Sequence, residues 1–332
     1  MTVSNVINGK AVVRQDTRQR VLEAIEATGY RVNAVARALA GGRNRMITVF
    51  SPQLNRPYAT EVIQGAAQAA GKLRYDLIVM MLSEEGFSDV SVMTRLAAGA
   101  LLIQPSREGR WQRTELPAHV VSVDGPGERR LTVDNYGGAR LATEHLLRLG
   151  HTRIGFISGL ESEDRRPASR PFDPEQHDRD DADERLRGYR DSMAAAGLKV
   201  PRNYVQHGDY SKASGEGAAL RLLRLAQPPS AIFVSGDAMA LGAMHVAQDL
   251  GMRVPDELSV VGFDDLPIAV ASRPGLTTVR QPLAQIGEVA VQLLVALAEG
   301  QAPALPAPFP TELIERESTA PPRDAPPGSP RH

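Results

Sequence analysis

The stretch Met46-Ile47-Thr48-Val49-Phe50 is the first of a series of short apolar runs that decide the fold class of this 332-residue chain. Similar runs recur at 77–81, 100–103, 119–123, 153–157, 231–234 and 258–261. The segments between them have helical character, at 59–73, 88–98, 138–149, 184–196 and 239–250. Continuous apolar runs separated by helices are typical of parallel strands covered on both faces. Two such series predict an α/β protein with two doubly wound parallel-sheet lobes and a ligand cleft between them.

The segment before this body has a different composition. From Met1 to Arg45 it carries eight basic and three acidic residues, a net charge of +5. Such a balance indicates either a nucleic-acid footprint or an ordinary solvated surface, and charge alone does not choose between them. Apolar periodicity predicts helices over 2–8 and 15–28.

A short helix is also expected at the junction of the two parts. Asn33 is a good N-cap, the interior is rich in Ala and Leu, and Gly41-Gly42 end the stretch. A helix of about ten residues is marginal in water on its own, because nucleation is costly. We therefore expect a coupling element that becomes ordered when a partner stabilises it.

The composition limits the function classes. The chain has no cysteine, which excludes disulfides and thiolate metal sites, and its hydrophobic fraction of 42% can fill large cores. It shows no run of about 18 apolar residues and no signal-peptide pattern, so we predict a cytoplasmic protein without a membrane segment. No spacing of histidines or acids suggests a metal or another cofactor. Two segments rich in charge and proline, 160–183 and 318–332, are predicted to be an irregular insert and a disordered tail.

Several motifs then occur in a consistent order. The N-terminal ones are Thr2-Val3-Ser4-Asn5-Val6-Ile7-Asn8-Gly9, Thr17-Arg18, Gly29-Tyr30 and Asn33 to Leu39. Those of the body are Asp134-Asn135 with Gly138-Ala139, His145-Leu146, Leu149-Gly150-His151, Gly236 to Gly242, Val254-Pro255, Val261-Gly262-Phe263-Asp264-Asp265 and Leu276 to Val279. Together they resemble the lactose-repressor (LacI/GalR) family of ligand-responsive transcriptional regulators, over nearly everything from Thr2 to Thr319.

The resemblance implies a periplasmic-binding-protein-like body whose lobes exchange segments. The implied divisions are a partial helix-turn-helix head (1–32), a hinge helix and linker (33–45), a two-lobed effector-binding and dimerisation domain (46–317) and the tail (318–332). Lobe 1 would hold about 46–150 and 281–300, and lobe 2 about 151–280 and 311–317. Three crossings between the lobes suit hinge closure around a small ligand.

The resemblance also implies a homodimer that binds double-stranded operator DNA. Paired Leu39 side chains would enter the minor groove and kink it, with Asn33 and Ala36 against the backbone or groove floor. The alternative for Leu39 is a core leucine of an ordinary linker helix. The recognition-helix residues that would contact DNA are Thr2, Ser4, Asn5 and Asn8, with Thr2 and Ser4 on phosphates and Asn5 on adenine.

The head departs from the family pattern at its start. Met1 lies just inside the implied recognition helix, whereas the family's head begins with a helix that packs under it. A recognition helix cannot bury its apolar face alone. We expect either that the true start lies upstream or that the DNA head is defective.

Four residues are implied to bind a small sugar-like effector. Asp264 ends a predicted strand and could accept hydrogen bonds from two ligand hydroxyls. Asp237 follows another strand, and its alternative role is a helix N-cap. Arg185 could donate to ligand oxygens, and Tyr58 could stack on a ring. Gly236 stands where the family usually has Asn, so it offers the ligand no side chain.

Two other functions compete with that of a regulator. An enzyme could use Asp264-Asp265 as a carboxylate pair, but Gly215-Glu216-Gly217 lacks the rest of a dinucleotide fingerprint, and no phosphate loop or nucleophile elbow occurs. A sugar-binding protein of the same fold would need export if it were periplasmic. A cytosolic sugar-binding protein that has lost operator binding through a truncated head stays open as the alternative.

Overall fold

The computed structural model describes residues 6, 13–28, 45–51, 54–81, 96–104, 116–125, 127–159 and 181–323. The chain divides into two compact units, Met1–Arg45 and Met46–His332. In the first unit, helix α2 (Gln15–Thr28) has the predicted bounds, and Asp16 in its first turn complements the helix dipole. The predicted helix at 2–8, apart from Val6, and the hinge stretch lie outside the described residues. Among the described residues, none of the helices combines the length and apolar character needed to cross a lipid bilayer.

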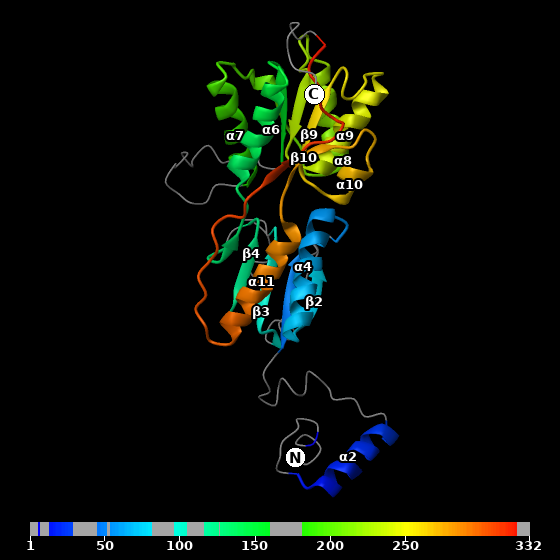
Figure 1. Cartoon of the computed structure of the whole chain (residues 1–332), viewed down its shortest axis with the longest axis vertical. Coiled ribbons are helices and arrows are strands. Elements are labelled where there is room, and N and C mark those ends of the chain that lie inside the picture. Colours follow the sequence, from blue (N-terminus) through cyan, green and yellow to red (C-terminus); the bar gives the residue numbers. More distant parts are fainter. Residues whose placement is uncertain are drawn as a thin grey trace. The chain divides into compact units, whose positions relative to one another are not determined.

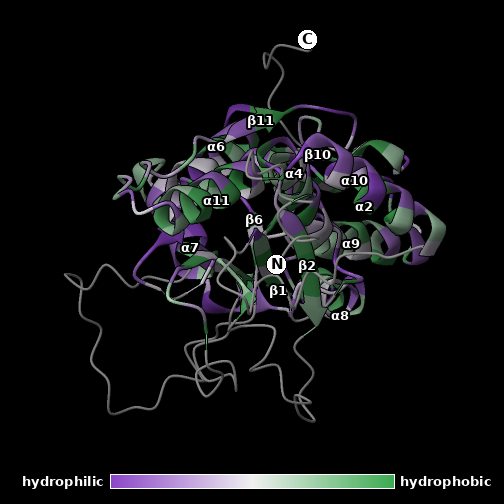
Figure 2. Cartoon of the chain, turned by 90° about the horizontal axis from the view of Figure 1, so that it is seen from below, coloured by the Kyte–Doolittle hydropathy of each residue, from purple (hydrophilic) through white to green (hydrophobic). Residues whose placement is uncertain are grey.

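The second unit contains two sheets, drawn with their helices in Figure 1. The first has the strand order β2-β1-β3-β4-β5 and is parallel throughout. Its strands are β1 (Met46–Ser51), β2 (Asp76–Met81), β3 (Gly99–Ile103), β4 (Val120–Val123) and β5 (Arg130–Leu131). Helices α4 (Pro57–Leu73) and α11 (Leu283–Ala298) pack on each other and on this sheet. Most residues of α11 are hydrophobic (green in Figure 2), because it buries a wide face.

The second sheet has the order β11-β10-β9-β8-β6-β7. Its strands are β6 (Ile154–Ser158), β7 (Val205–His207), β8 (Ala231–Val234), β9 (Ser259–Asp264), β10 (Thr277–Arg280) and β11 (Glu312–Ile314). Helices α6 (Asn135–Arg148) and α7 (Asp181–Ala195) pack together beside it, and α8 (Lys212–Leu223) and α9 (Asp237–Asp249) form a second pair. The helix α10 (Pro267–Ala271) and the 3-10 helix η3 (Arg202–Tyr204) are short. This is the doubly wound arrangement predicted from the apolar runs.

Each helix pair covers its own core. Beside α6 and α7, a chain of rings fills the space under the sheet, with the centroids of Phe156 and Tyr189 5.1 Å apart. Beside α8 and α9 the core is mostly aliphatic. The chain passes between the two sheets after β5, after β10 and before β11, and β11 pairs antiparallel with β10. These crossings bring residues that are distant in sequence to the carboxyl ends of the strands.

Several predicted boundaries need correction. Helix α6 begins at Asn135 rather than Gly138, because the Asp134 carboxylate accepts from the Gly137 amide and caps it. Helix α7 begins at Asp181, so 181–183 do not belong to the irregular insert, whose residues 160–180 lie outside the described part.

The expected start of the disordered tail at Ser318 is too early. The Ser318 side chain is fully buried and donates to the Val260 carbonyl at 2.6 Å, while the Thr277 amide donates to it at 2.8 Å. These bonds fix the chain against β9 and β10. Residues 324–332 lie outside the described part.

Gly215, from the incomplete dinucleotide fingerprint, serves helix packing, and so does Gly242. Gly215 lies inside α8, which the sequence did not predict. A Cβ there would lie 2.3 Å from the Met239 carbonyl oxygen of α9, and a Cβ on Gly242 would lie 2.3 Å from the Lys212 carbonyl oxygen of α8. Glycine at both positions therefore allows the two helices to approach closely.

Candidate effector site

Asp264 lies at the carboxyl end of β9, as predicted. Its side chain is buried, and Oδ1 accepts a hydrogen bond of 2.6 Å from Gln281 Nε2. Its φ of 120° is in a region that non-glycine residues rarely adopt. Burial raises the pKa of Asp264 to about 7, although Arg185 and the Gln281 amide offset part of this effect. A strained, buried carboxylate at a strand end is a common feature of binding sites.

Arg185 is held by protein acceptors in the same region. On α7 it is 3% exposed, its Nε donates to Asn135 Oδ1 at 2.8 Å, and its Nη1 donates to the Ser235 carbonyl at 2.5 Å. Its guanidinium carbon lies 3.8 Å from the centre of the Phe263 ring. The side chain is therefore rigid, with its orientation fixed before any ligand binds.

Tyr58 and Asp124 contribute from the first sheet. Tyr58, near the start of α4, is 7% exposed, and its hydroxyl donates a very short hydrogen bond to Asp124 Oδ2. Asp124 directly follows β4. Burial, and next the charge of Asp181, raises the pKa of Asp124 to about 7. Burial, and next the charge of Asp124, raises the pKa of the Tyr58 hydroxyl.

A further network ties α7 to β5 and α6. Asp181 Oδ1 accepts from Arg130 Nη2 at 2.7 Å, from Asn135 Nδ2 at 2.7 Å and from Thr132 Oγ1 at 3.0 Å. Since Asn135 also accepts from Arg185, these bonds form a continuous chain from β5 to the end of β8. The charge of Asp181 is thus balanced by Arg130, and Thr132 and Asn135 provide two further hydrogen bonds.

These side chains interact electrostatically with one another. Arg185 is close enough to Asp124, Asp181 and Asp264 for each of them to raise its pKa, although burial lowers it. Asp181 and Asp264 likewise influence Tyr58. We call the set Tyr58, Asp124, Asp181, Arg185, Asp264 and Gln281 the carboxyl-end cluster. Three of the four predicted effector residues, Tyr58, Arg185 and Asp264, belong to it.

Among the buried polar atoms in and beside this cluster, Asp124 Oδ1, Gln281 Oε1 and Ser235 Oγ have no hydrogen-bond partner in the described part of the chain. A buried polar group without a partner costs about 1–3 kcal/mol. Such atoms in a native protein usually serve a ligand or water.

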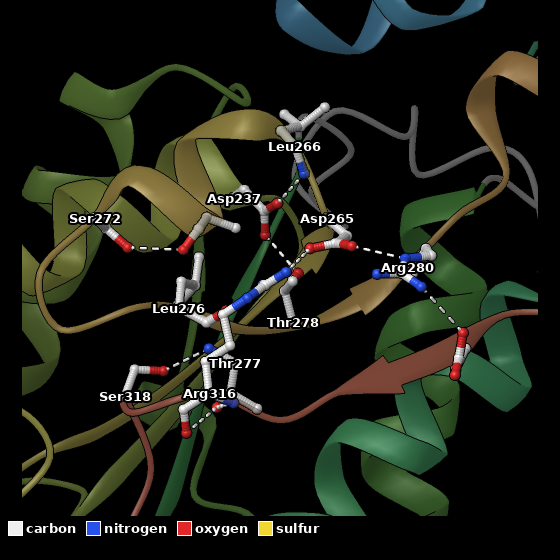
Figure 3. A network of polar contacts seen from close by, with 12 residues as sticks. Asp237, Asp265, Leu266, Ser272, Leu276, Thr277, Thr278, Arg280, Arg316 and Ser318 are labelled. Atoms are coloured by element: carbon white, nitrogen blue, oxygen red, sulfur yellow. Dashed lines mark hydrogen bonds and ion pairs between the residues drawn. The ribbon is translucent and has the colours of Figure 1, made fainter.

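Asp237, the fourth predicted effector residue, is placed differently, as Figure 3 shows. It is fully buried at the start of α9, where Oδ1 accepts from Thr278 Oγ1 at 2.6 Å and Oδ2 accepts from the Leu266 amide at 2.7 Å. The cap residue is Gly236, so the alternative of an Asp237 N-cap is wrong. Its carboxylate joins β10 to the segment after β9, and its contact with an effector stays a prediction.

The neighbouring Asp265 holds the two arginines that flank it (Figure 3). Its carboxylate pairs with Arg280 Nε at 2.7 Å and with Arg316 Nη2 at 2.6 Å. Arg280 ends β10 and precedes Gln281, the residue that enters the cluster. Asp264 and Asp265 therefore hold Gln281 and Arg280, which lie just before the crossing that leads to α11.

Gly236 gives room to an aromatic side chain. A Cβ at this position would lie 3.2 Å from Tyr210 Cδ1 and 3.6 Å from Asp264 Oδ2. Tyr210 also raises the pKa of Arg185. Tyr210 thus lies next to the space that a side chain at position 236 would occupy.

Sequence reasoning missed Asp124, Asp181 and Gln281. Asp124 follows an apolar strand, the same signal that identified Asp264, and could have been found by it. Asp181 was assigned to the irregular insert. Gln281 carries no local signal, because its role comes from the crossing chain after β10.

The opposite, amino ends of the second sheet also bury polar side chains. His151 is 2% exposed; its Nδ1 lies 2.9 Å from Ser230 Oγ, and its Nε2 lies 3.1 Å from Ser259 Oγ and 2.9 Å from the Ala320 carbonyl. His145 Nε2 lies 3.0 Å from Thr319 Oγ1. Burial lowers the pKa of His151 to about 4. We call His145, His151, Ser230, Ser259 and Ser318 the amino-end cluster, in which both ring nitrogens of His151 have protein partners.

The comparisons with known proteins agree with this architecture. Residues 1–33 match the model for bacterial regulatory proteins of the lacI family, and residues 143–319 match the periplasmic binding protein-like domain. The chain is 33% identical over 303 residues to catabolite control protein A of Priestia megaterium, covering 88% of this chain and 87% of that protein. The chain therefore belongs to the LacI family.

Two solved structures extend the likeness. The lac repressor dimer bound to operator and the anti-inducer ONPF superimposes with a TM-score of 0.79 at 27% identity, covering 96% of this chain and 94% of that chain. A complex of the transcriptional regulator CelR with cellobiose gives a TM-score of 0.70 at 28% identity, with coverages of 95% and 94%. The predicted DNA contacts Thr2, Ser4, Asn5, Asn8, Asn33, Ala36 and Leu39 lie outside the described residues.

Proposed function

We propose that this chain is a cytoplasmic, homodimeric transcriptional repressor whose operator affinity is set by a small sugar-like effector bound at the carboxyl-end cluster. The observation that carries the proposal is the convergence of Tyr58, Arg185 and Asp264, which come from α4, α7 and β9. Asp264 influences both Tyr58 and Arg185 electrostatically, and unpartnered polar atoms of Asp124, Gln281 and Ser235 lie in the same region. The lac repressor on its operator and CelR with cellobiose support the two kinds of partner.

In this proposal the divisions of the chain have separate roles. Residues 1–32 contact operator DNA, 33–45 form the hinge, and 46–317 bind effector and the second subunit. The effector's contacts to lobe 1 (Tyr58, Asp124) and lobe 2 (Arg185, Asp264) favour one relative placement of the lobes. Operator and effector affinities are then reciprocally coupled, typically by about 1–3 kcal/mol.

An operator titration of the full chain tests the DNA half of the proposal. The probe is a palindrome from the region upstream of its own gene, at fixed salt, because phosphate contacts make affinity salt-dependent. Leu39→Ala removes the proposed minor-groove wedge and should weaken operator binding at least tenfold. Leu305→Ala, at a 43% exposed leucine of the second unit, is the matched control and should not change it.

Equal operator affinity for wild type and Leu39→Ala would refute the wedge. Failure of the wild-type chain to prefer the palindrome over a scrambled duplex would refute the repressor and favour the cytosolic ligand-binding protein.

A further inference from the structure

We infer that Asn135 is a positioning residue of the effector site, whose side-chain amide keeps the Arg185 guanidinium from pairing with the Asp181 carboxylate. This inference rests on the proposed function, since it concerns the arginine that would contact the effector. It follows from the hydrogen bonds that one buried amide makes to two charged side chains of α7.

Asp181 and Arg185 are spaced as the two members of an ion pair within a helix. They are four residues apart in α7 and both are buried, so they lie on the same face of the helix. An acidic residue four positions before a basic one is also the more favourable order for such a pair. In the described part of the chain, however, the ion pair of Asp181 is with Arg130, at 2.7 Å, and not with Arg185. Another group therefore competes for Arg185.

The Asn135 side chain is that group. It is 3% exposed, its Nδ2 donates to Asp181 Oδ1 at 2.7 Å, and its Oδ1 accepts from Arg185 Nε at 2.8 Å. A carboxylate only accepts and a guanidinium only donates, so the two partners fix which way the amide points. Because an amide has both donors and an acceptor, this one side chain satisfies both charged groups at once.

The result for Arg185 is a guanidinium with a fixed plane. Its Nη1 donates to the Ser235 carbonyl at 2.5 Å, and its central carbon lies 3.8 Å from the centre of the Phe263 ring. Removing the Asn135 amide would leave Arg185 Nε without its acceptor and Asp181 Oδ1 without one of its donors. These two groups are complementary, so they would bond each other and the guanidinium would leave its place beside Ser235.

The main chain of Asn135 is fixed from outside α7. Asn135 is the first residue of α6 and ends the crossing that follows β5. The amide of its neighbour Asp134 donates to the Phe309 carbonyl at 2.8 Å, and the Phe309 amide donates to the Thr132 carbonyl at 2.9 Å. Two of the crossings between the sheets therefore hold each other at this point, and the Asn135 side chain orients Arg185 against them.

A crystal structure of the full-length Asn135→Ala variant tests the inference without any ligand. The Arg185 guanidinium should bond the Asp181 carboxylate directly and lose its bond to the Ser235 carbonyl. Asn135→Ser is a second variant, in case the first fails to fold; its side chain is too short to bond both groups, and it should show the same new pair. An Arg185 side chain that stays on Ser235 and away from Asp181 would overturn the inference.

A second-site variant separates positioning from a general loss of structure. Binding of glucose, galactose, ribose and cellobiose is measured by calorimetry, and the variants are compared with a sugar that binds the wild type. Asn135→Ala should weaken binding by about tenfold or more, because a charged hydrogen-bond donor is misplaced. Adding Asp181→Asn removes the competing carboxylate and should restore about fivefold or more of this loss.

Asp191→Asn is the matched control for the second site. Asp191 is another aspartate of α7, but its carboxylate bonds Tyr136, so adding Asp191→Asn to Asn135→Ala should restore nothing. Equal affinities of the single variant and of the double variant with Asp181→Asn would overturn the inference. If none of the sugars binds the wild type, the sugar-like effector of the proposed function is refuted, while the variant structure still decides the role of Asn135.

Discussion

The two ends of the second sheet both bury polar side chains, but they satisfy them differently. At the amino ends, the His145, His151, Ser230, Ser259 and Ser318 side chains all have a partner, and together they hold the chain at 315–320. At the carboxyl ends, Asp124 and Gln281 each keep an unpartnered atom, and Asp264 has a strained backbone. A buried network in which every polar atom has a hydrogen-bond partner stabilises the fold. A network with unpartnered polar atoms leaves hydrogen bonds that a ligand can make.

The pKa values show the same contrast. Burial lowers the pKa of His151 to about 4, so it stays neutral, which suits a ring whose nitrogens both bond neutral groups. Since Nε2 must donate to the Ala320 carbonyl, Nδ1 accepts from Ser230. Burial raises the pKa of Asp264 to about 7, which places a titrating group where a ligand would bind.

The largest effect is expected from removing the ring at the amino ends. His151→Ala should lower the free energy of unfolding by about 2–4 kcal/mol, because it removes the hydrogen bonds of the ring to Ser230, Ser259 and Ala320 and opens a cavity. Chemical denaturation measures this. His245→Ala, at a half-buried position of α9 in the same lobe, is the control and should cost clearly less. Equal costs would mean that the amino-end cluster is not specially stabilising.

The two ends should also give opposite pH dependences of stability. The unfolded state binds more protons at His151 than the folded state between pH 6.5 and 4, so this contribution falls by about 2 kcal/mol from pH 7 to 5. For Asp264 the folded state binds more protons between about pH 4 and 7, so stability falls as pH rises through that window.

Denaturation from pH 5 to 8 separates the two contributions. Relative to wild type, His151→Ala should be most destabilising near pH 7 and less so near pH 5. Asp264→Asn should gain relative stability as the pH rises from 5 to 8. Parallel curves for the three proteins would contradict the assigned protonation states.

Asp264→Asn should have its main effect on the ligand. It removes an acceptor that is charged above about pH 7, and hydrogen bonds to charged groups contribute about 1.5–3 kcal/mol, so at pH 8 the affinity for a sugar that binds the wild type should fall at least tenfold. Operator affinity without that sugar should stay within a factor of two. If His151→Ala reduced ligand affinity as much at a temperature where it is folded, the functional difference between the two ends would disappear.

The smallest effect is expected outside both clusters. Arg140 and Glu144 form an i, i+4 pair on α6, with side chains 50% and 43% exposed. Because solvent screens exposed pairs of this kind, Glu144→Gln should leave both the free energy of unfolding and the ligand affinity close to those of the wild type. A larger loss of stability would show that this pair stabilises α6 more than an ordinary exposed ion pair does.

Much of the fold was predictable from local patterns. The apolar runs located β1, β2, β3, β4, β6, β8 and β9 to within three residues at each end, because strands buried on both faces have few polar positions. Helix α8 was missed, since Ser, Gly and Ala give it little apolar periodicity and its packing depends on close approach to α9. The start of α7 was missed because charged residues precede it.

The candidate site was predictable only in part. Asp264 and Asp237 look alike in the sequence, since each closely follows a buried strand. Their difference comes from partners far along the chain: the Asp237 carboxylate accepts from Leu266 and Thr278, while the Asp264 carboxylate accepts from Gln281 and feels the charge of Arg185. No local pattern specifies these partners.

By itself, the sequence determined the class of fold, the family and half of the residues of the carboxyl-end cluster. It could do so because apolar periodicity and short motifs depend only on residues that are close together in the chain. The tertiary structure alone decided which buried polar atoms are saturated and which are left for a ligand. The physical reason is that a hydrogen bond needs its partner within about 3 Å in the right direction, and the crossings between the sheets set that distance.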